Sequence, residues 1–273
     1  MAIVTISRQV AALGDEIATA LAKELGYEFV NRKIIEKRIV ELGFPQEKLS
    51  KYDERKPNFF ASLAKDRDEY LDYVQTAVLE SAAKNNCILI GRGSFFILEN
   101  VPNVLAVRFV ANDEIRKARL MKEFDWNEKQ ALQRINESDT NRTGFNKSFF
   151  NVNISDASNY HLVLNTGVFD EKTAVPLLKT FVQIFSTPQA ENEGQRMLSD
   201  MLVCQNLINK LIFEHKLAIN FLNAKKVDGI IELHGVADSS ALSERALHIA
   251  SSILPDEQIK SCISVVQDFK AYN

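Results

Sequence analysis

The fold is decided near the N-terminus by the stretch TISRQVAALGDEIATAL, residues 5–21. An apolar run precedes Ser7, a turn follows it, and apolar residues then recur at helical spacing. The stretch therefore predicts a β-strand, a tight turn and an α-helix. Phosphate-binding proteins place their glycine-rich loop at such a turn. This turn contains one glycine, Gly14, which is followed by Asp15 where Lys or Arg is usual. The turn thus lies where a phosphate-binding loop would lie, but it lacks the further glycines and the basic residue of such a loop.

The same alternation continues through the first two thirds of the chain. Apolar runs predict strands at residues 2–7, 28–30, 87–90, 104–110 and 161–164. Helical patterns separate them, including residues 16–25, 113–124, 127–137 and 171–185. Uninterrupted apolar strands separated by helices predict an α/β fold with a doubly wound parallel sheet of about five strands. Ligands bind at the carboxyl ends of the strands in such sheets.

A polar stretch interrupts this pattern late in the chain. Residues 186–196, which include Pro188 and Gly194, predict a linker between a domain of residues 1–185 and a smaller one of residues 197–273. The smaller domain has the predicted order α-β-β-α-β, with a hairpin turn at Asp228 and Gly229.

Composition limits the function. The 273 residues carry 33 basic and 36 acidic side chains, a net charge of -3, which predicts no nucleic-acid partner. Neither a secretory signal nor a transmembrane segment is predicted, and we expect a cytoplasmic protein. Cys87, Cys204 and Cys262 have apolar sequence neighbours and are predicted to be buried, reduced thiols. The four histidines lack ligand spacing, so no metal site is predicted.

Asp15 is interpreted as the N-cap of the first long helix. Its carboxylate would occupy the place of a phosphate group. Like charges about 4 Å apart repel by roughly 4 kcal/mol at an effective dielectric constant of 20, or on the order of a thousandfold in affinity. Arg8 would compensate for part of this repulsion.

Several motifs together resemble the cytidylate kinase-like family, a branch of the P-loop nucleoside monophosphate kinases. They are Ile6-Ser7-Arg8-Gln9, Asn31-Arg32-Lys33-Ile34-Ile35, Ile90-Gly91-Arg92-Gly93, the 131–142 stretch with Asp139 and Arg142, and residues 159–166. The resemblance covers about residues 2–185. It implies that ATP binds at the loop after the first strand and that a pyrimidine monophosphate binds under a mobile lid.

The resemblance also implies roles for individual residues. Arg92 matches the arginine that holds the monophosphate acceptor, and Asp139 with Arg142 matches a D-x-x-R pair for cytidylate recognition and lid closure. The complete set of implied nucleotide-binding residues is Arg8, Gly14, Arg32, Arg92, Arg116, Arg119, Asp139 and Arg142. Arginine suits these tasks because its planar fork can hold phosphate oxygens in pairs.

Simpler interpretations stay open for some of these residues. Arg116 and Arg119 could be ordinary surface charges, and Asp139 with Arg142 could be an i, i+3 helix pair. Trp126 and the phenylalanines at positions 145, 149 and 150 are interpreted as packing residues rather than as a platform for base stacking.

The departures from the family pattern concern mainly the ATP side. The family loop is close to G-S-G-G-R, whereas this chain has Ala11-Ala12-Leu13-Gly14-Asp15. Asn31 replaces an acidic residue, and Ile135-Asn136 replaces an arginine-aspartate pair. We therefore expect a nucleotide-binding protein, a sensor or scaffold with weak or no phosphotransfer, since Asp15 and the missing loop cation weigh against Mg-ATP. The alternatives are an active nucleoside monophosphate kinase, in which Arg8 and lid arginines replace the loop cation, and a structural protein that binds no ligand.

The C-terminal part resembles a BON domain in residues 227–238, Glu244-Arg245-Ala246 and Ile249-Ala250. The resemblance implies attachment to a protein partner or self-association. A plain α+β unit that covers an apolar patch of the first domain is the alternative.

Overall fold

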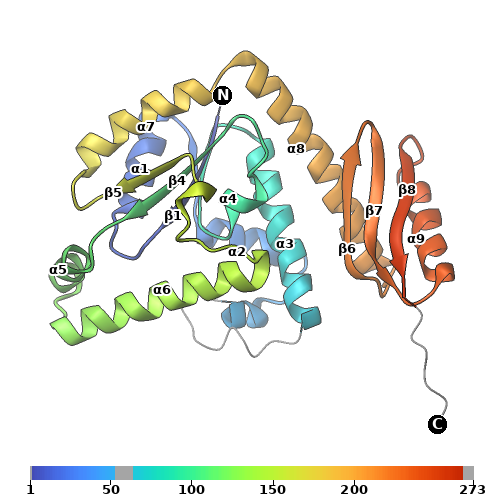
Figure 1. Cartoon of the computed structure of the whole chain (residues 1–273), viewed down its shortest axis with the longest axis horizontal. Coiled ribbons are helices and arrows are strands. Elements are labelled where there is room, and N and C mark those ends of the chain that lie inside the picture. The colour runs from blue at the N-terminus through green and yellow to red at the C-terminus, as the bar shows by residue number, and fades with distance from the viewer. Residues whose placement is uncertain (1, 53–63, 267–273) are drawn as a thin grey trace, which may run out of the picture. The chain divides into compact units, whose positions relative to one another are not determined.

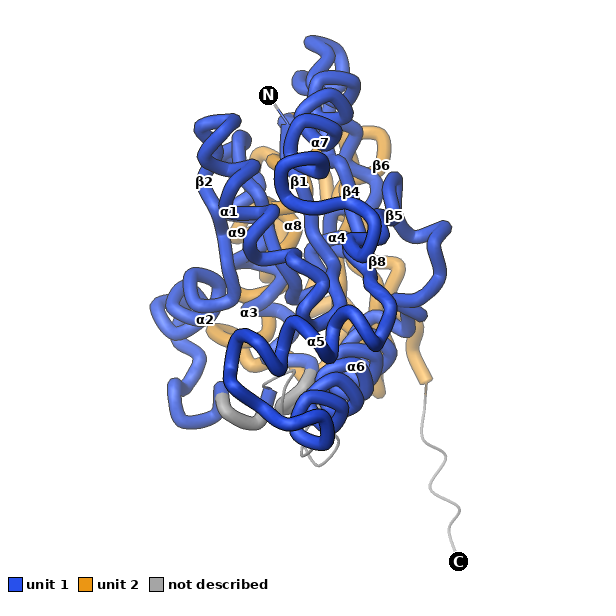
Figure 2. Tube along the Cα trace, turned by 90° about the vertical axis from the view of Figure 1, so that its left-hand side faces the viewer, with its two compact units in different colours: residues 1–195 blue, residues 196–273 orange. Residues whose placement is uncertain are grey.

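The computed structural model describes residues 2–52 and 64–266. The chain forms two compact units, residues 1–195 and 196–273 (Figure 2).

The first unit is built on a sheet of five parallel strands with the order β2-β3-β1-β4-β5. The strands are β1 (Ile3–Arg8), β2 (Glu28–Val30), β3 (Cys87–Ile90), β4 (Val104–Val110) and β5 (Leu162–Asn165). β1 lies at the centre, between β3 and β4, and its carboxyl end carries Ser7 and Arg8. The predicted doubly wound α/β fold with about five strands is confirmed.

Helices cover both faces of this sheet (Figure 1). They are α1 (Gly14–Leu25), α2 (Arg32–Glu41), α3 (Ala64–Ala83), α4 (Ser94–Ile97), α5 (Asp113–Phe124), α6 (Glu128–Phe150) and α7 (Glu171–Phe185), with short 3-10 turns at Gln46–Tyr52 and Ala157–Asn159. α1 and α7 pack together on one face, where Ile17, Leu105 and Leu178 belong to the main core. α3 and α4 contact the opposite face. Because side chains alternate along a strand, residues 104, 106 and 108 of β4 face away from the main core.

α6 is longer than predicted. The sequence indicated a helix over residues 127–137, but α6 continues to Phe150 and ends where Asn151 adopts a left-handed conformation. Its start was predicted within one residue because Asn127 and Gln130 form a capping box. Its second half contains Thr, Asn and Gly, which are poor helix formers, and it is held by packing of buried Phe145 and Phe150.

The predicted linker is helical. Residues 188–196 belong to α8 (Pro188–Asn209), and the division between the two units falls within this helix. Proline is tolerated in the first turn of a helix. Gly194 serves close packing rather than chain flexibility, since a Cβ atom there would lie 2.1 Å from Oδ1 of Asn103.

The second unit has a sheet of three strands, β6 (Asn220–Val227), β7 (Ile230–Ala237) and β8 (Gln258–Val265). β6 and β7 are antiparallel, and β7 and β8 are parallel. The C-terminal part of α8, a π-helical turn (Lys210–Glu214) and α9 (Ser240–Ile253) complete the unit. The predicted order α-β-β-α-β is confirmed. Asp228 and Gly229 form the hairpin turn with φ values of 50° and 81°.

No helix within the part of the chain that the structure describes is both long and apolar enough to cross a membrane.

Candidate functional site

The loop after β1 keeps a special backbone conformation without glycines. Ala11 and Leu13 have φ values of 56° and 53°, in the left-handed region that glycine usually occupies. Leu13 is the N-cap residue of α1 and provides no side-chain cap. The interpretation of Asp15 as the N-cap is therefore wrong, because α1 already begins at Gly14 and places Asp15 in its first turn.

Asp15 instead pairs with the preceding strand. Its Oδ2 accepts a hydrogen bond from Nε of Arg8 at 3.3 Å, while its side chain remains 61% exposed. Gly14 permits this approach, since a Cβ atom there would lie 2.6 Å from Cγ of Arg8. Arg8, the basic residue that ends β1, thus faces a carboxylate of its own chain.

Arg92 lies in the loop between β3 and α4. Gly91, Arg92 and Gly93 all have positive φ, so the backbone turns sharply and directs the side chain inward. The residue is only 2% exposed, and its guanidinium donates to the carbonyl oxygen of Tyr52 at 3.0 Å and to Glu36. Its Cζ also lies 5.6 Å from the ring centroid of Phe145.

Arg32 joins the same network through Glu36. Nε of Arg32 donates to Oε1 of Glu36 at 2.6 Å, and Arg92 contacts the same oxygen. Asn31, where the family has an acidic residue, caps α2, because its side-chain oxygen accepts from the amides of Lys33 and Ile34. Glu36 therefore links two of the predicted acceptor-side arginines.

Arg116 is an internal ion-pair residue and not a surface charge. It is 1% exposed and pairs with Asp139 at 2.9 Å and with Asp113 at 2.5 Å. The contact with Asp139 joins α5 to α6. Asp139 thus has Arg116 as its partner, so the interpretation of Asp139 and Arg142 as a simple helix pair is also wrong.

Arg119 holds the backbone of two loops. Its guanidinium donates to the carbonyl oxygens of Ala11 at 2.9 Å and of Thr166 at 2.6 Å, and to Oγ1 of Thr166 at 3.2 Å. Burial lowers the pKa of Arg119, and nearby Glu16 opposes this effect. The surface-charge interpretation therefore fails for Arg119 as well.

Arg142 reaches from α6 to the end of β1, where its Nη1 donates to the carbonyl oxygen of Arg8 at 2.8 Å. A cavity of about 20 Å³ lies at this point. It is lined by Ser7, Arg8, Gly91, Arg92, Gly93, Phe95, Arg142, Asn146 and Ile154. The structure thus brings together three predicted site residues, Arg8, Arg92 and Arg142. The other five, Gly14, Arg32, Arg116, Arg119 and Asp139, do not line this cavity.

Sequence reasoning missed Arg108, on β4. It is 5% exposed, its Nη1 donates to Oγ of Ser7 at 2.7 Å, and its Cζ lies 5.6 Å from the ring centroid of Tyr160. The signal was present, because one arginine interrupts the apolar strand VLAVRFV near its carboxyl end.

The aromatic residues near the site pack against one another. Phe145 and Phe149 have ring centroids 4.7 Å apart, and Phe149 also lies against Tyr52 and Tyr70. Trp126 stacks on Phe124 with centroids 4.7 Å apart. These contacts support the packing interpretation.

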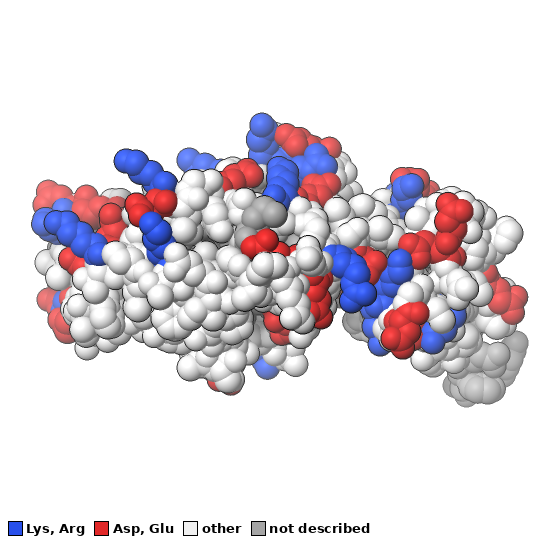
Figure 3. All heavy atoms as spheres, turned by 90° about the horizontal axis from the view of Figure 1, so that it is seen from above, with Lys and Arg blue, Asp and Glu red and all other residues white. Residues whose placement is uncertain are grey.

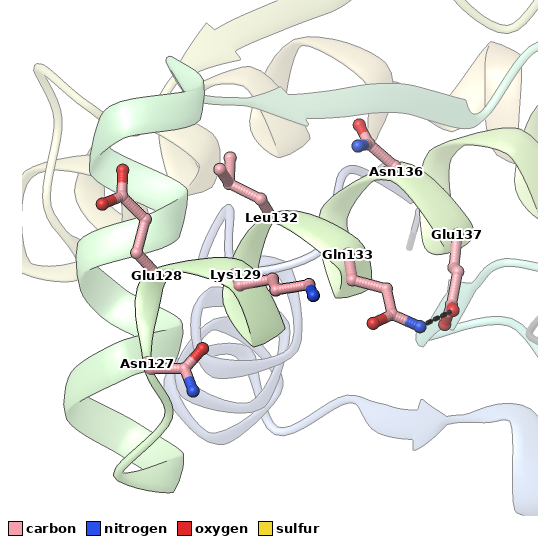
Figure 4. Close-up of a pocket in the computed structure, with 7 residues that line it drawn as sticks. All are labelled: Asn127, Glu128, Lys129, Leu132, Gln133, Asn136 and Glu137. Carbon is pink, nitrogen blue, oxygen red and sulfur yellow. Dashed lines mark hydrogen bonds between the residues drawn. The ribbon is translucent and has the colours of Figure 1, made fainter.

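A wider hollow lies elsewhere on the surface, along the first half of α6 (Figure 4). Its lining is Asn127, Glu128, Lys129, Leu132, Gln133, Asn136 and Glu137, with a hydrogen bond of 2.7 Å from Gln133 to Glu137. All these residues come from one helix and its cap, and none is a predicted site residue. The hollow therefore lacks the convergent groups of a binding site.

In the second unit, three side chains with metal-binding atoms lie close together. The ligand atoms of Glu232, His234 and Cys262 lie within 4.8 Å of one another. The histidine spacing could not indicate this group, because the parallel register of β7 and β8 places Cys262 beside His234. Lys260 and Lys225 already pair with Glu232, at 2.8 and 3.4 Å, so the carboxylate is neutralised without a metal ion.

The prediction of three buried thiols is correct for Cys87 and Cys204 and wrong for Cys262. Burial raises the pKa of Cys87 to about 12 and that of Cys204 to about 11. Cys262 is exposed because strand alternation directs its neighbour, Ile263, into the core instead.

Charged side chains of both signs lie near one another on one face of the molecule. On the face drawn in Figure 3, the Lys and Arg residues that the structure describes are interspersed with Asp and Glu. The expected absence of a nucleic-acid partner stays a prediction.

Comparisons with known proteins agree with the fold and the loop position. The chain matches the cytidylate kinase-like family over residues 3–168. A cytidylate kinase from Methanocaldococcus jannaschii is 29% identical over 132 residues, which are 48% of this chain and 68% of that protein. A cytidylate kinase from Archaeoglobus fulgidus is 24% identical over 186 residues, which are 66% of this chain and 94% of that protein.

A solved structure supports the architecture of the first unit. An uncharacterized protein from Eubacterium ventriosum matches with a TM-score of 0.53 and 17% identity, covering 67% of this chain and 98% of that one. At this identity the likeness concerns the fold alone. The family match spans more than half of the chain and includes β1, its loop and the arginines at the strand ends. The chain therefore belongs to the cytidylate kinase-like family.

Proposed function

We propose that this chain binds a nucleoside monophosphate, or a similar phosphate monoester, at the carboxyl ends of β1 and β3, as a sensor or scaffold with weak or no phosphotransfer. The observation that carries the proposal is the convergence of Arg8, Arg92 and Arg142 on one cavity from three separate elements. Arginines that meet at the strand ends of a parallel sheet suit an anionic ligand.

The acceptor is proposed to be a cytidine nucleotide, with CMP as the first candidate. The two relatives named as cytidylate kinases supply this suggestion. Arg92 would contact the phosphate group directly, and Arg32 would act through the shared carboxylate of Glu36. The cavity of about 20 Å³ holds roughly one water molecule, so ligand entry requires movement of a wall such as α6.

The ATP-binding part of the site, at the loop after β1, is proposed to be impaired. Asp15 presents a negative charge in the first turn of α1, where a triphosphate would approach, and Arg8 is paired with it at 3.3 Å. Phosphoryl transfer depends mainly on positioning and on neutralising phosphate charge. Residues 9–16 supply no Lys or Arg for that purpose.

Calorimetric titration with CMP and, separately, with Mg-ATP tests this proposal. We expect CMP to bind, and Arg92→Met to weaken CMP at least about tenfold through loss of a charge-assisted contact. Arg38→Met is the matched control, because Arg38 also pairs with a glutamate, Glu80 at 2.5 Å, but does not line the cavity. Urea unfolding of each variant shows whether a loss of binding is a loss of fold.

One observation favours an active kinase as the second candidate. Ala11 and Leu13 keep left-handed backbone conformations, and Arg119 fixes the Ala11 carbonyl, so the loop has retained a defined shape. Magnesium-dependent formation of ADP with CMP as acceptor would establish this function, and Mg-ATP would then bind as well. If neither CMP nor Mg-ATP binds at millimolar concentration, the chain is a structural or interaction protein.

The second unit is proposed to attach the chain to a protein partner or to a second copy. Its sheet carries exposed apolar side chains at Phe221 and Val227 of β6 and at Val265 of β8. Sedimentation equilibrium of the chain and of Phe221→Ser tests self-association. A monomer at all concentrations would leave a different protein as the expected partner.

A further inference from the structure

We infer that Arg108 is a phosphate-recognition residue, held by Ser7 and Tyr160 beside the cavity. Its buried positive charge would pair with the phosphate group of a bound ligand. This inference rests on the proposed function and assigns a residue to its acceptor side. It concerns a residue of the β4 interior rather than of a loop.

The first argument is the charge balance of Arg108. The residue is 5% exposed, and no carboxylate whose side chain the structure describes forms an ion pair with it. The other deeply buried arginines differ, since Arg92 pairs with Glu36 and Arg116 pairs with two aspartates. A buried charge is unfavourable unless it is paired. Arg108 is therefore a positive charge without a negative partner among the described residues.

The second argument is the chemistry of its neighbours. Arg108 has a hydroxyl oxygen, Oγ of Ser7, as its hydrogen-bond acceptor at 2.7 Å. Oη of Tyr160 lies 3.3 Å from the same oxygen and also donates to the carbonyl oxygen of Ile154 at 3.1 Å. The aromatic ring fixes the guanidinium by a cation-π contact. These groups orient Arg108 without neutralising it.

The third argument is location. β1 and β4 are neighbours in register, with Ser7 opposite Arg108. Ser7 also lines the cavity formed with Arg8, Arg92 and Arg142. A phosphate that reaches this cavity would find Ser7 at its wall and the guanidinium of Arg108 directly behind. Replacement of the Ser7 contact by a phosphate oxygen would give Arg108 the negative partner that it lacks.

The experiment compares the chain with Arg108→Met, which keeps an unbranched apolar stem and removes the charged guanidinium. Arg245→Met, an exposed arginine on α9, is the control for the change in net charge. The ligands are inorganic phosphate, CMP and cytidine, titrated by calorimetry at one ionic strength. We expect Arg108→Met to weaken phosphate and CMP at least tenfold and to leave cytidine unchanged, and Arg245→Met to behave like the unmodified chain.

The stability of the unliganded protein provides an independent measurement. Because the charge of Arg108 lacks a carboxylate, we expect the urea midpoint of Arg108→Met to equal or exceed that of the unmodified chain. A large fall in the midpoint would show that the arginine serves packing, and would overturn the inference. Failure of this variant to fold is the extreme form of such a fall and would overturn the inference as well.

The outcomes separate this inference from the proposed function. If CMP binds equally to the chain and to Arg108→Met, the inference is wrong and the proposed function stands. If inorganic phosphate binds in an Arg108-dependent manner and CMP does not bind, the nucleotide proposal is wrong and Arg108 is still an anion site. If none of the ligands binds the unmodified chain, both are wrong.

Discussion

Arg119 on α5 donates a hydrogen bond of 2.9 Å to the carbonyl oxygen of Ala11, in the loop after β1. A side chain more than 100 residues away thus fixes the backbone of the phosphate-loop position. The same guanidinium holds Thr166 after β5, so three segments of the first unit meet at one arginine.

Arg119→Ala should destabilise the protein by about 2 kcal/mol, because charge-assisted hydrogen bonds to two loops are lost. Urea unfolding measures this change, and Lys122→Ala, at an exposed position of the same helix, is the control. Equal stabilities of the two variants would contradict the anchoring role.

Asp15→Asn should leave the free energy of unfolding within about 0.5 kcal/mol of the unmodified value, because Asp15 does not cap α1 and its pair with Arg8 is exposed. The same change should tighten Mg-ATP by roughly fivefold, because Asp15 is 61% exposed and removing a charge near 4 Å in water is worth about 1 kcal/mol. Asp170→Ala is the contrasting variant. Asp170 accepts from the Thr173 amide as a true cap of α7, so its loss should cost about 1 kcal/mol.

Ala11→Gly should stabilise the protein by about 1 kcal/mol, because Ala11 has a φ of 56° and glycine avoids the left-handed penalty. Ala12→Gly is the control, since Ala12 is fully buried and lies outside the left-handed region, so that the change should destabilise. A lower denaturation midpoint for Ala11→Gly would show that contacts of the Ala11 methyl group stabilise the loop by more than its left-handed conformation costs.

Glu36→Gln should destabilise the protein by about 3 kcal/mol, because it removes a carboxylate that pairs with the nearly fully buried Arg92. Glu80→Gln should cost less than about 1 kcal/mol, since its partner Arg38 is 40% exposed. Thermal or urea unfolding of both variants at neutral pH provides the comparison. A similar loss for the two glutamates would refute the dependence on burial.

His161 should make the stability depend on pH. Its Nδ1 accepts a hydrogen bond from the Ala106 amide at 2.9 Å, which requires the neutral ring, and partial burial lowers the pKa of His161 below 6.5. The unfolded chain therefore binds the proton more readily, so the contribution is complete above pH 6.5 and is lost as the pH falls through the lowered pKa. Unfolding of His161→Asn should show a flatter pH dependence between about pH 7 and 5, since asparagine does not titrate.

The sheet was predictable because its strands are continuous apolar runs between helices. The limits of the site were less predictable. Asp15 suggested a cap by residue type alone, whereas the chain enters α1 one residue earlier and turns Asp15 toward Arg8. Arg116 resembled a surface charge because its partner Asp139 is recognisable only when α5 and α6 are packed together.

Arg108 shows a different limit. Its position within an apolar strand was visible, but its significance depends on Tyr160, 52 residues away, and on the absence of a carboxylate partner among the described residues. The pairing of β1 with β4 and the lack of a carboxylate near a buried arginine are properties of the folded core, and they cannot be read from a single sequence. The helical state of residues 188–196 was missed for a similar reason, because the close approach of Gly194 to Asn103 is a tertiary contact.

The way in which Arg119 anchors the Ala11 carbonyl has an evolutionary consequence. The contact uses the backbone carbonyl of Ala11, so a substitution at the exposed position 15 can be accepted while the loop keeps its course. Loss of donor chemistry by drift would then leave the architecture intact, and one charge reversal at position 15 would be a short path back. The shape of the loop and the charge that it presents to a ligand can thus change independently of each other.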